Sequence, residues 1–145
     1  MTAGFVTPLR VQFLAQWDGW RQLVVTLEPL RFRSVVLDRE ITVPAGFVSD
    51  RESRPTAGPI SGPEMNPAGV LHDYLYRTHE VSRDEADAVY HEALLSMGLD
   101  PVWADQRYRA VAQLGASAFE HGPERFRLLN VLALDVPMPY GATPA

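Results

Sequence analysis

The pattern of apolar and polar positions divides the chain into a β-rich first part and a helical second part. Residues 5–14, 21–32 and 35–43 are short apolar-rich or alternating segments, which is typical of half-buried strands. Residues 17–20 contain an Asp-Gly pair, which is favoured in the tight turns of hairpins. The pattern therefore predicts a small antiparallel sheet within residues 1–46.

Residues 47–66 lose this pattern and are rich in Pro, Gly and Ser. Ordered loops of this length without regular secondary structure often carry function. We expect a long ordered loop that leads into the helical part of the chain.

The second part has the three- and four-residue spacing of amphipathic helices. Asn66 is a good helix cap, and the proline after it suits the first helical position. Ser82 and Glu85 have the spacing of a capping box at the start of a second helix. A third helix is predicted over residues 102–119, so that residues 67–120 form the helical part.

The last segment, residues 121–145, ends in a Pro-rich stretch. Residues 126–134 allow a short helix or strand, and the Pro-rich end after them is predicted to be an extended arm. Together the patterns predict one α+β domain over residues 1–145. Its parts are a small N-terminal antiparallel sheet, a long ordered loop, three packed helices and an extended C-terminal arm.

Four side chains in the helical part are predicted to converge. His72 and Asp73 are adjacent in an apolar and aromatic stretch, and Tyr76 follows His72 at helical spacing on a shared face. Asp87 lies at the edge of the apolar stripe of the next helix. Because burying a carboxylate is costly unless it is paired, we expect His72 and Asp87 to lie within about 2.6–3.2 Å of each other.

These residue types in this arrangement can activate a water molecule. His72 is the predicted general base, and Asp87 would orient the ring through its other nitrogen. Adjacent helical side chains point about 100° apart, so Asp73 would reach the opposite side of the cleft and bind a hard cation. The alternative interpretation is a buried polar network that locks two helices together.

The predicted cation is calcium, which takes roughly six to eight oxygen ligands, many of them backbone carbonyls. Gly58, Ser61 and Gly62, in the loop before the helix, are the predicted sources of those oxygen atoms beside Asp73. Asp50 is a further predicted ligand. Its alternative role is to stabilise a turn through local backbone hydrogen bonds.

Composition excludes several classes of function. The net charge of -5 argues against nucleic-acid binding, which requires basic patches. The chain has no Cys, which excludes disulfides and thiolate metal sites. No apolar run approaches the ~20 residues of a membrane span, and the N-terminus lacks the pattern of a signal peptide. We therefore expect a soluble chain without a transmembrane segment, made without export by the general pathway.

The pattern His-Asp-x-x-Tyr at residues 72–76, followed by Ala-Asp-x-x-Tyr at residues 86–90, resembles the active site of secretory phospholipases A2. It resembles the phospholipase domain of parvovirus capsid proteins more closely. The resemblance implies that His72 activates water, that Asp73 binds calcium and that Asp87 orients His72, with Tyr76 as a supporting hydrogen-bond donor. It covers residues 58–90.

A wider part of the chain resembles a phage-associated family of uncharacterised function. Residues 43–50 read Val-Pro-Ala-Gly-Phe-Val-Ser-Asp and are followed by Ser53 and Pro55, and residues 70–76 and 82–87 continue the family pattern. This resemblance extends over most of the chain and implies a bacteriophage or prophage origin without supplying an activity.

The leading hypothesis is a phage-encoded, calcium-dependent hydrolase that resembles phospholipases A2 and is carried in the virion to help deliver the genome. Its partners would be membrane phospholipid as substrate and other virion proteins, with synthesis in the host cytoplasm and a final place in the tail. The alternative is a non-catalytic tail, baseplate or virion-assembly protein. A third interpretation is a phage factor that acts on a host protein.

Overall fold

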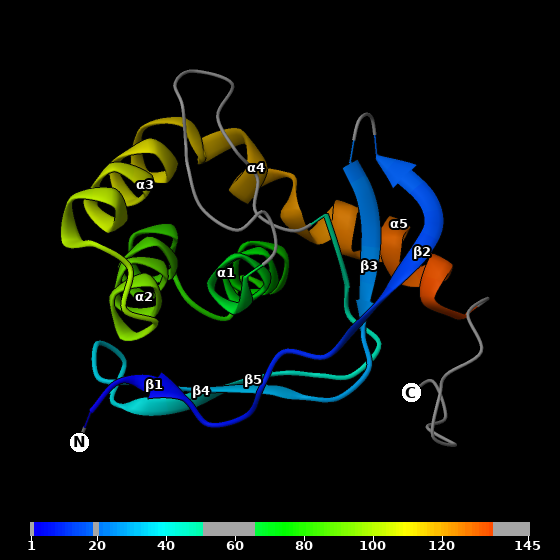
Figure 1. Cartoon of the computed structure of the whole chain (residues 1–145). Helices are drawn as coiled ribbons and strands as arrows, with labels where there is room; N and C mark the ends of the chain where they lie inside the picture. Colours follow the sequence, from blue (N-terminus) through cyan, green and yellow to red (C-terminus); the bar gives the residue numbers. More distant parts are fainter. Residues whose placement is uncertain (1, 19–20, 51–65, 135–145) are drawn as a thin grey trace.

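A computed structural model describes residues 2–18, 21–50 and 66–134 of the 145-residue chain. Within these residues, two antiparallel sheets precede five helices, which confirms the predicted α+β fold (Figure 1). None of the helices described is both long and apolar enough to cross a membrane.

The β-rich part forms two three-stranded sheets, where the sequence predicted one small sheet. The strands are β1 (Gly4–Phe5), β2 (Val11–Asp18), β3 (Arg21–Thr26), β4 (Leu30–Ser34), β5 (Arg39–Val43) and β6 (Val48–Ser49). The first sheet has the order β1-β4-β5 and the second has the order β2-β3-β6. Neighbouring strands are antiparallel throughout.

Two prolines explain why the strands are shorter than the pattern predicts. Pro8 lies in the gap that divides the predicted strand 5–14, and Pro29 lies in the gap that divides the predicted strand 21–32. Proline has no N–H to donate to a strand ladder, so it interrupts the pairing. The strand predicted over residues 35–43 starts late, because its first four residues form a turn with one residue in the left-handed region.

The helices are α1 (Pro67–Thr78), α2 (Arg83–Ser96), α3 (Pro101–Leu114), α4 (Ala116–Glu120) and α5 (Gly122–Leu134). Both predicted caps are present: Asn66 Oδ1 accepts a hydrogen bond from the Gly69 N–H at 2.8 Å, and Ser82 and Glu85 form the reciprocal capping box. α1 contacts α2 and α5 and lies between them (Figure 1). This central position buries most of α1, so polar side chains on α1 can meet side chains from several other elements.

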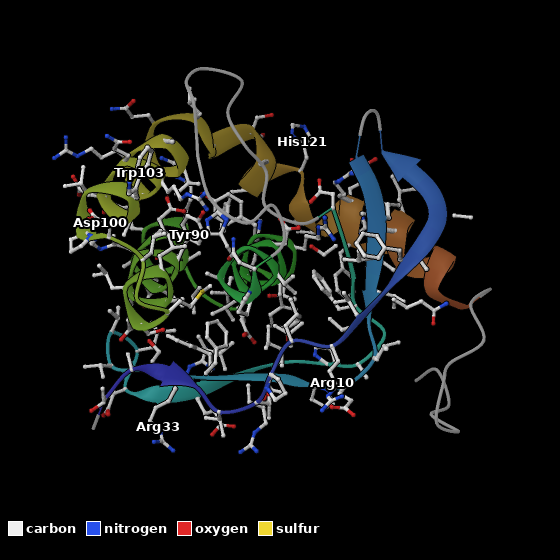
Figure 2. All side chains as sticks on the ribbon, in the orientation of Figure 1. Arg10, Arg33, Tyr90, Asp100, Trp103 and His121 are labelled. Atoms are coloured by element: carbon white, nitrogen blue, oxygen red, sulfur yellow. The ribbon has the colours of Figure 1, made fainter. Side chains whose placement is uncertain are left out.

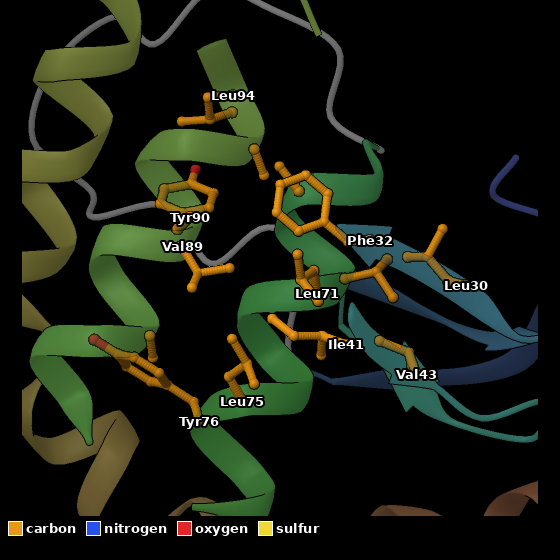
Figure 3. Close-up of a cluster of buried hydrophobic side chains, with 14 of the residues drawn as sticks. Leu30, Phe32, Ile41, Val43, Leu71, Leu75, Tyr76, Val89, Tyr90 and Leu94 are labelled. Atoms are coloured by element: carbon orange, nitrogen blue, oxygen red, sulfur yellow. The ribbon is translucent and has the colours of Figure 1, made fainter. Parts of the chain in front are cut away.

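The main core lies between the first sheet and the helices. β4 alternates buried and exposed residues, so that Phe32 faces the helices while Arg33 points away from them (Figure 2). Ile41 of β5 lies with Phe32 against Leu71 and Leu75 of α1 (Figure 3). All of the apolar members of this group are fully buried, and this packing fixes which face of α1 remains for chemistry.

The third predicted helix, over residues 102–119, is interrupted at Gly115, where α3 ends and α4 begins. Residues 122–134 form α5, so the helix is present of the two alternatives left open for residues 126–134, and it begins four residues earlier. Leu129 of α5 is buried in a second core cluster with side chains of the second sheet, and this burial favours the helix. Residues 135–145 lie outside the described residues.

The predicted loop 47–66 begins with a short strand, because β6 pairs with β3. Its remaining part, from residue 51 to residue 65, lies outside the described residues. Three of the predicted metal-ligating residues, Gly58, Ser61 and Gly62, fall in that part.

Candidate active site

His72, Tyr76 and Asp87 form a buried hydrogen-bonded group where α1 faces α2. His72 Nε2 lies 2.8 Å from Asp87 Oδ1, so the predicted contact between these residues is present. The Tyr76 hydroxyl donates to the same Oδ1 atom at 2.6 Å. Because an ionised carboxylate can only accept, His72 donates from Nε2, and a neutral ring then carries its basic lone pair on Nδ1.

The His72 ring is held between two aromatic rings. Its centroid lies 4.1 Å from that of Tyr76 and 4.7 Å from that of Tyr90 on α2, and Figure 2 shows Tyr90 within the helical layer. Burial raises the pKa of the Tyr76 hydroxyl, and its hydrogen bond to Asp87 raises it further. Tyr76 therefore stays neutral and keeps donating its proton to Asp87.

Asp87 is almost completely buried, with 1% of its surface exposed. Its second oxygen, Oδ2, is buried and has no hydrogen-bond partner among the described residues. An ionised carboxylate in such a place depends on the donors at its other oxygen. His72 and Tyr76 are therefore essential to the position of Asp87, and Asp87 in turn fixes the orientation of the His72 ring.

His72 and Tyr76 also line a cavity of about 500 Å³. This volume is within the usual range for small-molecule sites. α1, α3, α4 and α5 all contribute to its wall. Its lining without polar side chains consists of Ala110, Val111, Leu114, Gly115, Ala118 and Gly122. Its polar lining consists of Asp50, His72, Asp73, Tyr76, Arg77, Ser117, His121 and Arg125.

Two carboxylates and two guanidinium groups form a charged cluster in this cavity. Asp73 Oδ2 accepts from the Ser49 hydroxyl at 2.7 Å and lies 3.5 Å from Arg77 Nη2. The same Nη2 donates to Asp50 Oδ1 at 3.3 Å, and Arg125 Nη2 lies 3.7 Å from Asp50 Oδ2. The cluster therefore joins the end of β6 to α1 through buried groups and to α5 through the partly exposed Arg125.

Burial changes the protonation equilibrium of the Asp73 carboxyl group. Burial raises its pKa well above the usual value, and the neighbouring charge of Asp50 raises it further. Arg77 and the Ser49 hydroxyl act in the opposite direction but do not cancel the effect. A cationic ligand that displaced Arg77, or a proton, would relieve the repulsion between the two carboxylates.

Arg77 is held in place by several buried contacts. Its side chain is 5% exposed, its Nη1 donates to the Val48 carbonyl, and its guanidinium carbon lies 5.2 Å from the centre of the Phe47 ring. Such a guanidinium, packed on an aromatic face and bonded to two carboxylates, loses little freedom when it meets a ligand.

The predicted metal-ligating residues are only partly brought together by the described structure. Asp50 and Asp73 line the same cavity and, with the Ser49 hydroxyl, offer the hard oxygen atoms that calcium prefers. Among the described residues there is no group of three or more acidic, His or Cys side chains that could hold a metal ion. The described donors therefore fit calcium only as part of a larger set.

Sequence reasoning missed two members of the site. Arg125 comes from α5, just before the residues for which the sequence allowed a short helix or strand, and Ser49 enters through the pairing of β6 with β3. No local spacing links either residue to α1. Arg77 carried a signal, because it follows Asp73 at the i,i+4 spacing of helical ion pairs.

Residues 24–111 match the model of a family described as "Protein of unknown function (DUF1353)". The match spans more than half of the chain, so the chain belongs to this family. No curated protein and no solved structure matches the chain. The matched residues include α1 and α2, which carry His72 and Asp87, whereas α4 and α5, which close the cavity, lie beyond them.

Proposed function

We propose that this member of the DUF1353 family is a hydrolase that cleaves an acyl ester with water activated by His72. The observation that carries the proposal is the bond of His72 Nε2 to Asp87 Oδ1, with the ring lining a 500 Å³ cavity. A base oriented by a buried carboxylate beside a substrate-sized cavity is the arrangement that general-base hydrolysis requires.

The proposed reaction uses His72 twice. A water molecule gives its proton to Nδ1 as its oxygen attacks the ester carbonyl, and a tetrahedral intermediate forms. When the intermediate collapses, the bond to the alcohol oxygen breaks and the imidazolium returns the proton to that oxygen. Asp87 stabilises the imidazolium between these steps, and the Tyr76 hydroxyl holds Asp87 in place.

The proposed substrate is a phospholipid, because the cavity is lined by apolar side chains and by charged side chains, which suit the two parts of an amphiphile. Ala110, Val111 and Leu114 form an apolar wall that suits an acyl chain. Arg77 and Arg125 also line the cavity and supply positive charge that suits an anionic head group. A lining with both apolar and cationic side chains supports an acyl ester with a nearby phosphate as the substrate.

We propose calcium as the cofactor, held by Asp73 and Asp50 with oxygen atoms from residues 58–62. When bound, it would polarise the ester carbonyl and stabilise negative charge on its oxygen. It would have to compete with Arg77, which pairs with both carboxylates.

The virion setting is a proposal that rests on the sequence resemblance to phage-associated chains. A phospholipid hydrolase in the tail would act on the host membrane while the genome is delivered. The alternative is a structural virion protein in which the His72–Asp87–Tyr76 group locks α1 to α2. The burial of all three residues favours neither role over the other.

The substitution His72→Gln separates these roles. Gln keeps hydrogen-bonding capacity and approximate size but cannot act as a base near neutral pH. We expect fatty-acid release from mixed liposomes with calcium to fall by at least ~100-fold, with little change in melting temperature. The matched control is His91→Gln, because His91 lies on α2 outside this cavity and contacts the Tyr108 ring.

Wild-type protein that releases no fatty acid would overturn the enzyme proposal. A His72→Gln variant that also loses about 1–3 kcal/mol of unfolding free energy, as expected when a buried polar partner is disturbed, would then support the structural role.

A further inference from the structure

Gly115 has a conformation that does not require glycine. It lies between α3 and α4 with φ of -84° and ψ of -5°, which any residue can adopt. It is buried, and its N–H donates to the Val111 carbonyl at 2.8 Å. The reason for a glycine here must therefore be space.

The space around Gly115 is taken by the Tyr76 side chain. A Cβ atom at this position would lie closer than 3.0 Å to Tyr76 Oη, a separation that real Cβ atoms essentially never show. It would also lie 3.2 Å from Tyr76 Cε2 and crowd the Val111 carbonyl. The atom that Gly115 accommodates is thus the hydroxyl that donates to Asp87 Oδ1.

Tyr76 has little room to avoid such a Cβ. Its ring lies 4.1 Å from the His72 ring on one side and 5.3 Å from the Phe119 ring, which it meets edge-on. A ring pushed by residue 115 must therefore move His72 or Phe119, or give up its bond to Asp87. Moving His72, or breaking the bond between Tyr76 and Asp87, changes the group that orients the His72 ring.

We infer that Gly115 is a positioning residue, whose missing side chain keeps the Tyr76 hydroxyl on Asp87 and so holds the His72 ring in its working orientation. This inference rests on the proposed hydrolase function. Gly115 lies outside the residues matched by the family model, which end at residue 111. Gly115 therefore adds a residue of the α3–α4 junction to the group formed by His72, Asp87 and Tyr76.

The test is a double-mutant cycle with Gly115→Ala and Tyr76→Phe. Phe lacks the Oη atom, so it removes the closest clash while it leaves the ring. We expect Gly115→Ala alone to lower kcat for a soluble short-chain phospholipid by about 10–100-fold, because small misplacements of catalytic groups are costly, with KM nearly unchanged. In the Tyr76→Phe background the same change should lower kcat by less than about twofold, since no hydroxyl is left to displace.

A second readout does not depend on activity. The unfolding midpoint in urea should show the same non-additivity, with Gly115→Ala less harmful in the Tyr76→Phe protein than in the wild type. Gly4→Ala is the matched control, because a Cβ there meets nothing within 4 Å. It should leave both kcat and the midpoint unchanged.

The outcomes separate this inference from the proposed function. Equal losses of kcat in both backgrounds would overturn the positioning role, because they would place the damage at the Val111 carbonyl. The wild type could also be active and show non-additive effects on stability but additive effects on kcat. The Gly115–Tyr76 contact would then be a packing contact only, and the positioning role would be overturned as well. A wild type without hydrolysis would overturn the proposed function and the catalytic part of this inference, and the stability cycle would then decide the Gly115–Tyr76 contact alone.

Discussion

Asp73 interacts with both the negative and the positive groups of the charged cluster in the cavity. It lies next to His72 in sequence, accepts from Ser49 and shares Arg77 with Asp50. Two carboxylates this close repel each other unless a cation or a proton lies between them. The protonation of Asp73 is therefore linked to the stability of the fold as well as to any ligand in the cavity.

We predict that Asp73 makes the protein less stable as pH rises, in calcium-free buffer. Burial, aided by Asp50, raises the pKa of Asp73 well above its usual value, so the folded state binds a proton more tightly than the unfolded chain does. The free energy of unfolding then falls as pH rises from the unfolded pKa, about 3.9, towards the folded pKa. In the Asp73→Asn variant, the free energy of unfolding should fall less over this pH range, because the titrating carboxyl group is absent.

Urea unfolding of both proteins from about pH 4 to about pH 8 measures this difference. The control is Asp105→Asn, because Asp105 pairs with Arg109 on the surface of α3 and does not line the cavity. Stability curves that run parallel for wild type and Asp73→Asn would contradict the prediction.

At the scale of elements, the site depends on how closely α5 approaches α1. Gly122 is the first residue of α5, and a Cβ there would lie 2.8 Å from the Tyr76 carbonyl carbon and 3.1 Å from Arg77 Cα. The start of α5 thus lies directly on the backbone of α1. This contact brings Arg125, one helical turn later, into the cavity beside Asp50.

We predict that Gly122→Ala destabilises the protein by about 1–3 kcal/mol, the usual cost of overpacking. The obstacle is backbone, which cannot rotate away as a side chain can. Thermal or urea unfolding measures the loss, with Gly4→Ala as the control in open space. An unchanged midpoint would show that α5 can move from α1 without cost.

The sequence predicted those parts of the site that depend on local spacing. Helix caps and apolar stripes placed His72 and Tyr76 on one face of α1 and Asp87 on the facing helix, and the structure has these contacts. It did not predict Arg125 or the role of Gly115. Their places depend on the packing of α4 and α5 against α1, and a break at a glycine with ordinary dihedral angles leaves no local signal.

At the scale of the whole molecule, the charged cluster joins the β-rich part to the helical part. Asp50 directly follows β6, Asp73 and Arg77 belong to α1, and Arg125 belongs to α5. Asp73 and Arg77 are four residues apart, whereas the contacts of Asp50 with Arg77 and Arg125 join residues that are distant in sequence. A ligand that binds this cluster therefore acts on the arrangement of both parts and should be visible in global stability.

We predict that calcium raises the melting temperature of the wild type and that Asp73→Asn removes the increase. A ligand that binds only the folded state stabilises it by about 1.4 kcal/mol when its free concentration is tenfold above Kd. For a chain of this size, that corresponds to a rise of roughly 3–6 °C. Asp73 and Asp50 would hold the ion from α1 and from the end of β6, so the stabilisation would reach both parts of the fold.

Melting curves with millimolar calcium, with magnesium and with a chelator provide the measurement. Asp105→Asn should keep the calcium response, because its carboxylate lies outside the cavity. Magnesium should give a smaller rise, since it demands a tighter octahedral set of ligands than two carboxylates shared with Arg77 offer. A wild type that melts at the same temperature in calcium and in chelator would remove the metal from the proposal. Arg77 would then be the cation that pairs with Asp73 and Asp50, and any hydrolysis by His72 would have to proceed without calcium.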